Sequence, residues 1–171
     1  MRITTIAALV ACATLPMTVC AQTMDVPDAV KAPAGNKAAM TLKGAGDLTY
    51  ECKTNAAGAM EWTFAGPMAT LTDTRTGQTV GKYYGGPTWE AMDGSKVTGK
   101  QQAVAPSSAG NIPLQLVKAE PAMGKGMMEG ITYIQRVNTK GGVAPADACS
   151  AANAGAKMTV PYQADYVFYR M

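Results

Sequence analysis

The chain has 171 residues, of which 47% are hydrophobic and 16% are charged, with a formal net charge of +3 and no histidine. The absence of histidine excludes Ser-His-Asp and Cys-His catalysis and removes the commonest side-chain ligand from any zinc site. The basic residues are scattered and are mostly lysine, so we do not expect nucleic acid as a partner.

Residues 1–21 have the pattern of a secretory signal peptide. Arg2 supplies a positive charge, residues 6–19 are mostly apolar, and small residues precede a cleavage point after Ala21. We expect ordinary secretion to the periplasm or the extracellular medium, in preference to lipidation of Cys20. Removing 21 residues from 171 leaves 150, enough for one domain. No later apolar run is long enough for a transmembrane segment.

Two cysteines, Cys52 and Cys149, remain after removal of the signal peptide. In an oxidising compartment two cysteines pair more often than not, so a disulfide between them is predicted. Such a bridge closes a long loop and contributes roughly 4–5 kcal/mol in the chain-entropy model. Two separately buried thiols are the alternative, and a catalytic thiol is disfavoured because no histidine can activate it.

The rest of the chain predicts an all-β domain. Residues 22–38, with little hydrophobic pattern, predict an extended leader that lies on the domain or is partly disordered. Residues 39–171 contain short alternating segments separated by turn residues, which favours an antiparallel sandwich or barrel of about nine or ten short strands. The clearest expected strands are residues 48–53, 60–65, 69–72, 78–84, 112–118, 131–138 and 162–169.

Two other stretches depart from this strand pattern. Residues 101–111 are polar and contain Pro106-Ser107-Ser108, which predicts a long exposed loop. Residues 145–154 are alanine-rich and begin with Pro145, so at most one short helix, Pro145–Ala154, is expected there, and it would carry Cys149.

Residues 81–95 form what we call the aromatic corner, because two tyrosines, a tryptophan and two carboxylates gather within it. Gly85-Gly86-Pro87 predicts the end of one strand and the start of another, and Asp93-Gly94 predicts a tight hairpin turn. With a two-residue turn, Trp89 would pair with Thr98. The corner would therefore hold its aromatic side chains close together.

An aromatic surface at the corner is the leading candidate for a binding site. Such a surface could stack against a glycan or another small flat ligand, with a few polar side chains as partners. Packing of Trp89 in the core is the favoured alternative, whereas Trp62 is expected to be buried with Met60 and Phe64. The candidate binding residues are Tyr83, Tyr84, Trp89, Glu90, Tyr133 and Arg136, with Lys96 nearby.

Catalytic and metal chemistry have weaker candidates. Glu90 and Asp93 could form an acid–base pair, but Asp93 precedes Gly94, where turn formation is its ordinary role. No metal site or other cofactor is expected. Thioethers among Met123, Met127 and Met128 could bind Cu(I), although methionine more often fills a core.

Five ordered blocks of sequence resemble one known family. The blocks are YEC at residues 50–52, GPTWEAMDGS at 86–95, ITYIQRVNTKGGVAP at 131–145, Cys149, and VPYQADYVFY at 160–169. They resemble domain-of-unknown-function family 3455, a group of exported bacterial and fungal proteins, and the resemblance covers residues 26–169. It implies no established activity.

The chain departs from this family at two places. Relatives usually have histidine where this chain has Tyr83, and a tryptophan-containing run where it has Ile112-Pro113-Leu114-Gln115-Leu116. Any family chemistry that uses the histidine would be lost here. Taken together, the sequence favours an exported ligand-binding or cell-envelope-associated module over an enzyme. The alternatives are a histidine-free hydrolase acting through Glu90 and a structural or stress-related envelope protein.

Overall fold

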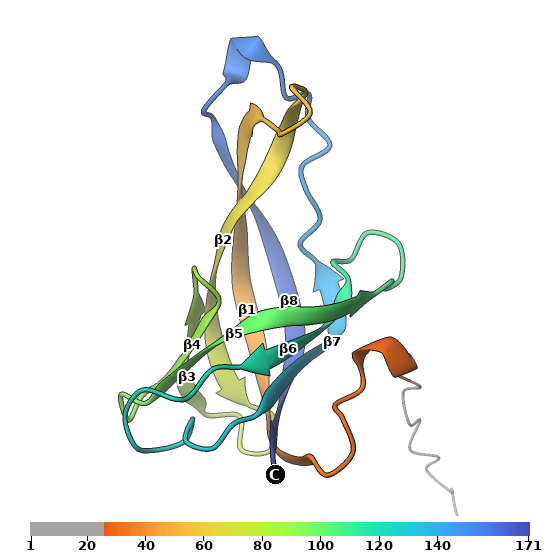
Figure 1. Cartoon of the computed structure of the whole chain (residues 1–171). Coiled ribbons are helices and arrows are strands. Elements are labelled where there is room, and N and C mark those ends of the chain that lie inside the picture. Colours follow the sequence, from red (N-terminus) through yellow and green to blue (C-terminus); the bar gives the residue numbers. More distant parts are fainter. Residues whose placement is uncertain (1–25) are drawn as a thin grey trace, which may run out of the picture.

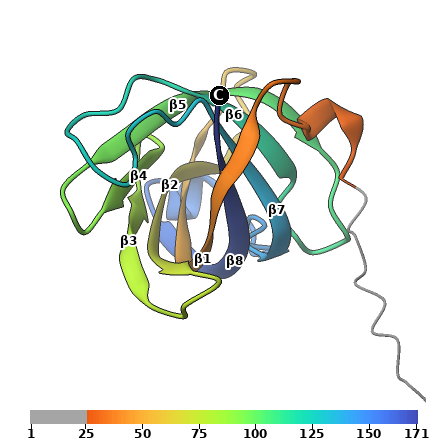
Figure 2. The ribbon, with the colours of Figure 1, turned by 90° about the horizontal axis from the view of Figure 1, so that it is seen from below.

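A computed structural model describes residues 26–171, and the predicted signal peptide lies outside the described residues. Eight antiparallel strands follow one another around a single sheet, and the last pairs with the first to close a barrel (Figure 2). The all-β prediction is confirmed. The strands are β1 (Lys37–Thr54), β2 (Met60–Asp73), β3 (Thr79–Tyr84), β4 (Thr88–Ala91), β5 (Lys96–Ala105), β6 (Leu114–Ala119), β7 (Tyr133–Gly141) and β8 (Lys157–Arg170).

The described residues contain no α-helix and two short 3-10 turns, η1 (Asp28–Val30) and η2 (Ala151–Asn153). The helix expected between Pro145 and Ala154 is therefore only the turn η2. None of the helical segments in residues 26–171 is long and apolar enough to cross a membrane.

The strands are fewer and longer than the sequence predicts. Residues 60–65 and 69–72, expected as two strands, belong to the single strand β2, which continues past Gly66 and Pro67. Residues 101–105, expected in an exposed loop, lie in β5 and pair with β6. Polar composition misleads here because an outer strand surface can face water while its backbone remains paired.

Three strands extend beyond the barrel as a ribbon (Figure 1). β2 pairs with β3 only from Met68 onward, and β8 pairs with β7 only from Tyr162 onward. Before those points the two strands pair with β1 alone. We call this three-stranded projection the ribbon.

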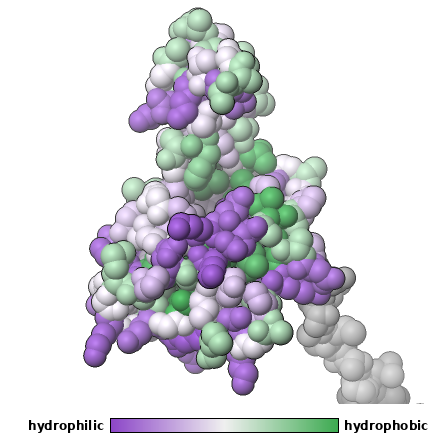
Figure 3. Space-filling view, in the orientation of Figure 1, coloured by the Kyte–Doolittle hydropathy of each residue, from purple (hydrophilic) through white to green (hydrophobic). Residues whose placement is uncertain are grey.

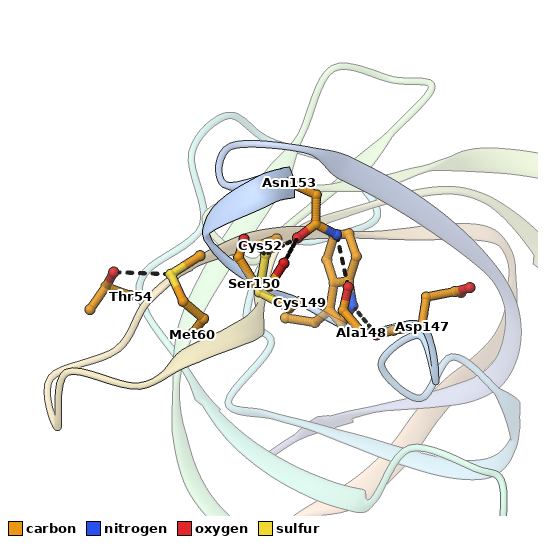
Figure 4. The surroundings of a disulfide bond; sticks show 9 residues. Cys52, Thr54, Met60, Asp147, Ala148, Cys149, Ser150 and Asn153 are labelled. Carbon is orange, nitrogen blue, oxygen red and sulfur yellow. Dashed lines mark hydrogen bonds between the residues drawn. A yellow bond between two sulfur atoms is a disulfide. The ribbon is translucent and has the colours of Figure 1, made fainter.

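The predicted bridge between Cys52 and Cys149 is confirmed and lies on the ribbon, with the two Cα atoms 5.5 Å apart (Figure 4). Trp62 Nε1 donates a hydrogen bond of 2.8 Å to the carbonyl oxygen of Asp147. Asn153 Nδ2 donates to the carbonyl oxygen of Ala148, and the Ser150 backbone N–H donates to Asn153 Oδ1. The disulfide and the Trp62 hydrogen bond attach the β7–β8 connection to the ribbon, and the two bonds of Asn153 hold the connection in shape.

The barrel interior is filled by stacked aromatic rings. The Tyr83 and Trp89 rings lie 4.6 Å apart at 18°, and the Tyr166 ring contacts both. Gly44 leaves room for this arrangement, because a Cβ there would lie 2.6 Å from the Tyr166 ring. Trp89 is 1% exposed, so the core alternative for this residue is correct.

The expectation that Trp62 is the buried tryptophan is wrong. Trp62 is only partly buried, and Phe64 beside it on the same face is 50% exposed. Both lie on the ribbon half of β2, where no opposite barrel wall covers them. Alternation of side chains predicts a shared face, but not what covers that face.

The hairpin between β4 and β5 differs by one residue from the prediction. Trp89 pairs with Val97 and not with Thr98, because the turn has Met92-Asp93-Gly94 between the closing residues. Gly94 takes a left-handed conformation with φ of 86°. This register places Trp89 opposite the buried Val97, inside the barrel.

The described part of the leader, residues 26–36, packs against the outside of the barrel. Val30 in η1 is fully buried and forms a small cluster with Ala105 of β5 and Leu116 of β6. Gln135 Nε2 of β7 donates a hydrogen bond of 2.6 Å to the carbonyl oxygen of Val30. The leader is thus held to the outer wall by both apolar and polar contacts.

Replacing Trp89 by alanine should lower the free energy of unfolding by about 3–5 kcal/mol, because it removes the largest buried side chain of the core. Urea unfolding followed by circular dichroism measures this loss. The control Phe64→Ala removes a half-exposed ring and should cost much less. Similar losses in both variants would contradict the assignment of Trp89 to the core.

Candidate functional site

The structure separates the six predicted binding residues into three places. Three of these residues, from β3, β4 and β7, lie inside the barrel. The other three lie outside it, on two different parts of the wall. No single exposed aromatic surface is formed, because Tyr83 and Trp89 are 5% and 1% exposed. The interior holds Tyr83, Trp89 and Arg136; the outer wall of β3 and β4 holds Tyr84 and Glu90; and Tyr133 packs outside against the Val30 cluster.

Glu90 forms a small polar network on the outer wall. Tyr84 Oη donates a hydrogen bond of 2.5 Å to Glu90 Oε2, and Lys82 Nζ lies 3.4 Å from Oε1. The Tyr84 hydroxyl, aided by the positive charges of Lys82 and Lys96, lowers the pKa of Glu90. Glu90 is therefore ionised at neutral pH and is poorly suited to donate a proton as a general acid.

Asp93 has a structural position at the hairpin turn. Its Oδ1 accepts hydrogen bonds from the backbone N–H and the hydroxyl of Ser95, at 2.9 and 2.6 Å. Its Oδ2 accepts one of 2.7 Å from the backbone N–H of Met127. These bonds lower the pKa of Asp93. Asp93 and Glu90 hold separate sets of partners, and Asp93 joins the turn to the loop that precedes β7.

A group of four tyrosines, the tyrosine cluster, surrounds Arg136 at the ribbon end of the barrel interior. Burial raises the pKa of each phenol, and the nearby positive charge of Arg136 partly opposes this rise. Arg136 is the register partner of one member, Tyr166, on the neighbouring strand β8. The cluster consists of Tyr50, Tyr83, Tyr162 and Tyr166.

Three hydroxyl groups of the tyrosine cluster have hydrogen-bond partners within the domain. Tyr50 Oη donates to the carbonyl oxygen of Gly142 at 2.7 Å. The hydroxyl oxygens of Tyr162 and Tyr166 lie 3.2 Å apart. Tyr83 and Tyr166 thus take part both in the ring packing around Trp89 and in the polar tyrosine cluster.

A groove of about 700 Å³ lies on the outside of the barrel, between the leader, residues 106–108 and the outer wall of β7 and β8. In Figure 1 the orange leader and the green loop after β5 lie on either side of this region. Its wall includes Asn138, which has a left-handed φ of 53° at a register shift of β7. Asn138 Nδ2 donates a hydrogen bond of 2.6 Å to Asp165 Oδ2.

Sequence reasoning did not identify this groove as a whole, because its walls come from segments far apart in the chain. The local signals are Pro106-Ser107-Ser108, expected in an exposed loop, and Asn138, since asparagine tolerates positive φ better than most residues. No group of three or more acidic or cysteine side chains that could hold a metal ion occurs in the part of the chain that the structure describes. The three methionines proposed for Cu(I) differ in burial: Met128 is in the core and Met123 is exposed.

Replacing Asp93 by asparagine should flatten the acid part of the stability profile. The folded pKa lies below its ordinary value of 3.8, so the carboxylate contributes stability above that pH. This contribution is lost as the pH falls through the folded pKa. Urea midpoints of wild type and Asp93→Asn should therefore differ most near neutrality and converge at low pH. Asp147→Asn, on the exposed β7–β8 connection, is the control, and a constant difference at all pH values would contradict the assignment.

A family model described as a protein of unknown function, DUF3455, matches residues 33–170. The match extends from the leader to the end of β8 and includes the tyrosine cluster, the aromatic corner and the groove lining except for Val26 and Pro27. No curated protein and no solved structure matches the chain. The resemblance seen in the five sequence blocks is confirmed, and the chain belongs to the DUF3455 family of proteins of unknown function.

Proposed function

We propose that this domain is a binding protein that holds a small molecule in the groove on its outer wall. The volume of the groove, about 700 Å³, carries the proposal, because small-ligand sites commonly enclose about 300–1,000 Å³. We also propose that the domain works in the periplasm or outside the cell, because residues 1–21 have the pattern of a secretory signal peptide.

The lining of the groove has the mixed chemistry of a ligand site. Val26, Leu114 and Val137 offer apolar surface from the leader, β6 and β7. Lys43 of β1 and Gln163 of β8 add polar groups that could orient a bound molecule. A few polar groups beside an apolar wall provide both affinity and orientation.

Two side-chain hydrogen bonds hold the wall around Asn138. Asn138 is bonded to Asp165, and Thr139 Oγ1 donates a hydrogen bond of 2.8 Å to Ser107 Oγ of the opposite loop. Bulges and residues with unusual backbone angles are enriched near binding sites, where they direct side chains. A wall that is already ordered would lose little conformational entropy when a ligand binds.

The other functional interpretations receive less support. A glycan cannot stack on Tyr83 and Trp89 while these rings pack against Tyr166 in the core. A hydrolase that uses Glu90 as its acid would need a raised pKa, whereas Tyr84 lowers it. A structural or stress-related envelope protein would need no ligand, so an inert groove would favour that alternative.

A fragment library screened by ligand-observed NMR tests the proposal. Lys43→Trp places a large ring in the groove, while Lys118→Trp makes the same change on an exposed part of β6 outside it. Compounds that bind wild type and Lys118→Trp but not Lys43→Trp would support the groove. The absence of binders, or binders that Lys43→Trp retains, would overturn it.

The backbone of Asn138 gives a separate prediction. Alanine there should lower the free energy of unfolding by about 1–2 kcal/mol, because a Cβ without a polar end disfavours the left-handed conformation. Asn138→Gly should be much closer to wild type, since glycine adopts this conformation without steric cost. Thermal and urea unfolding measure both variants. Equal losses would show that the Asp165 hydrogen bond, and not the backbone angle, dominates.

A further inference from the structure

We propose that the ribbon end of the barrel binds a second kind of molecule, one that joins a carboxylate or phosphate group to an apolar body, with Arg136 as the anchor. This site lies on the inner face of the sheet, whereas the groove lies on its outer face, so the inference goes beyond the proposed function.

The fold directs Arg136 inward through strand alternation. Its neighbour two residues earlier, Ile134, packs in the barrel core, and Gln135 between them bonds to the leader outside. Arg136 therefore shares the inner face with its register partners, Gln115 of β6 and Tyr166 of β8.

The guanidinium group of Arg136 lacks an anionic partner. Its Nε and Nη2 both donate to the carbonyl oxygen of Pro113, at 3.1 and 3.0 Å. Both bonds go to this one oxygen, so the N–H groups of Arg136 outnumber their acceptors among residues 26–171. No carboxylate of residues 26–171 forms an ion pair with it. A partly buried cation usually has an anion beside it, which here a ligand would supply.

The Trp89 indole, which packs against the tyrosine cluster, is a second donor without an acceptor in the described part of the chain. Trp89 Nε1 is fully buried and has no hydrogen-bond partner among the described residues. The indole packs edge-on against Tyr166, which is the register partner of Arg136. The interior is therefore short of acceptors, and carboxylates and phosphates are acceptors that pair strongly with guanidinium. A cationic or neutral ligand would leave this deficit in place.

Exposed apolar side chains lie beside the same end of the barrel. Phe64 is 50% exposed, and its ring contacts that of Tyr50, a member of the tyrosine cluster, at 5.8 Å. Val104 is 47% exposed and pairs with Gln115, which pairs in turn with Arg136. Figure 3 shows hydrophobic surface at the junction between ribbon and barrel. An apolar body next to the anionic group would cover these side chains.

Thermal unfolding with four probes tests the site: benzoate, phenyl phosphate, inorganic phosphate and benzyl alcohol. Benzoate or phenyl phosphate should raise the melting temperature in a saturable way, since a ligand that binds only the folded state stabilises it. The stronger of the two identifies the preferred anion. Inorganic phosphate should act more weakly and benzyl alcohol should have no effect.

Arg136→Gln should weaken binding of the better anion about tenfold or more, because it removes the charge-assisted hydrogen bonds. Arg75→Gln, in the β2–β3 turn, is the matched control and should bind as wild type does. No saturable rise with either aromatic anion, or equal affinity in Arg136→Gln, would overturn the proposal. Loss of binding in Lys43→Trp with retention in Arg136→Gln would also overturn it, because it would assign the anion to the groove.

A second measurement applies if Arg136→Gln does not fold. The indole N–H signals of Trp62 and Trp89 can be assigned with Trp62→Phe and followed by NMR during titration with benzoate. Movement of the Trp89 signal, with binding weakened in Phe64→Ala, would support the site. A Trp89 signal that does not move at saturating benzoate would overturn it.

Discussion

The pairing of the first strand with the last is the constraint on which the rest of this structure depends. β1 and β8 are paired from Lys37 and Arg170 to Glu51 and Lys157, which closes the sheet and leaves no free edge in the barrel. Closure creates the inside that buries Trp89, Tyr166 and Phe168. Because β1, β2 and β8 are longer than the barrel needs, the same pairing also produces the ribbon, where the disulfide holds the β7–β8 connection.

Two candidate sites lie on opposite faces of one strand. In β7, Arg136 points into the barrel toward the tyrosine cluster, while the next residue, Val137, lines the outer groove. Strand alternation separates these neighbours across the sheet, so one segment contributes to two chemically different environments. The register shift after Val137 adds the left-handed Asn138 and gives the groove a wall that regular alternation would not form.

The aromatic corner shows where prediction from residues succeeds and where it stops. Its strand ends and its turn at Gly94 follow from local chemistry, because glycine accepts the left-handed angle that the turn requires. A difference of one residue in the turn changes the partner of Trp89 from Thr98 to Val97. That partner is buried, so the register places the indole in the core and leaves Glu90 outside with Tyr84. Register depends on turn length, which the dipeptide Asp-Gly alone does not specify.

The sequence by itself determined the all-β class, the pairing of Cys52 with Cys149 and the family, because these follow from strand periodicity, cysteine number and ordered motifs. Only the tertiary structure decided which aromatic side chains are buried and where concave surfaces form. The groove joins the leader to four strands, β1, β6, β7 and β8, and the tyrosine cluster joins β1, β3 and β8. Such sites arise from ring closure between residues far apart in the chain, and no local pattern records which distant segments will meet.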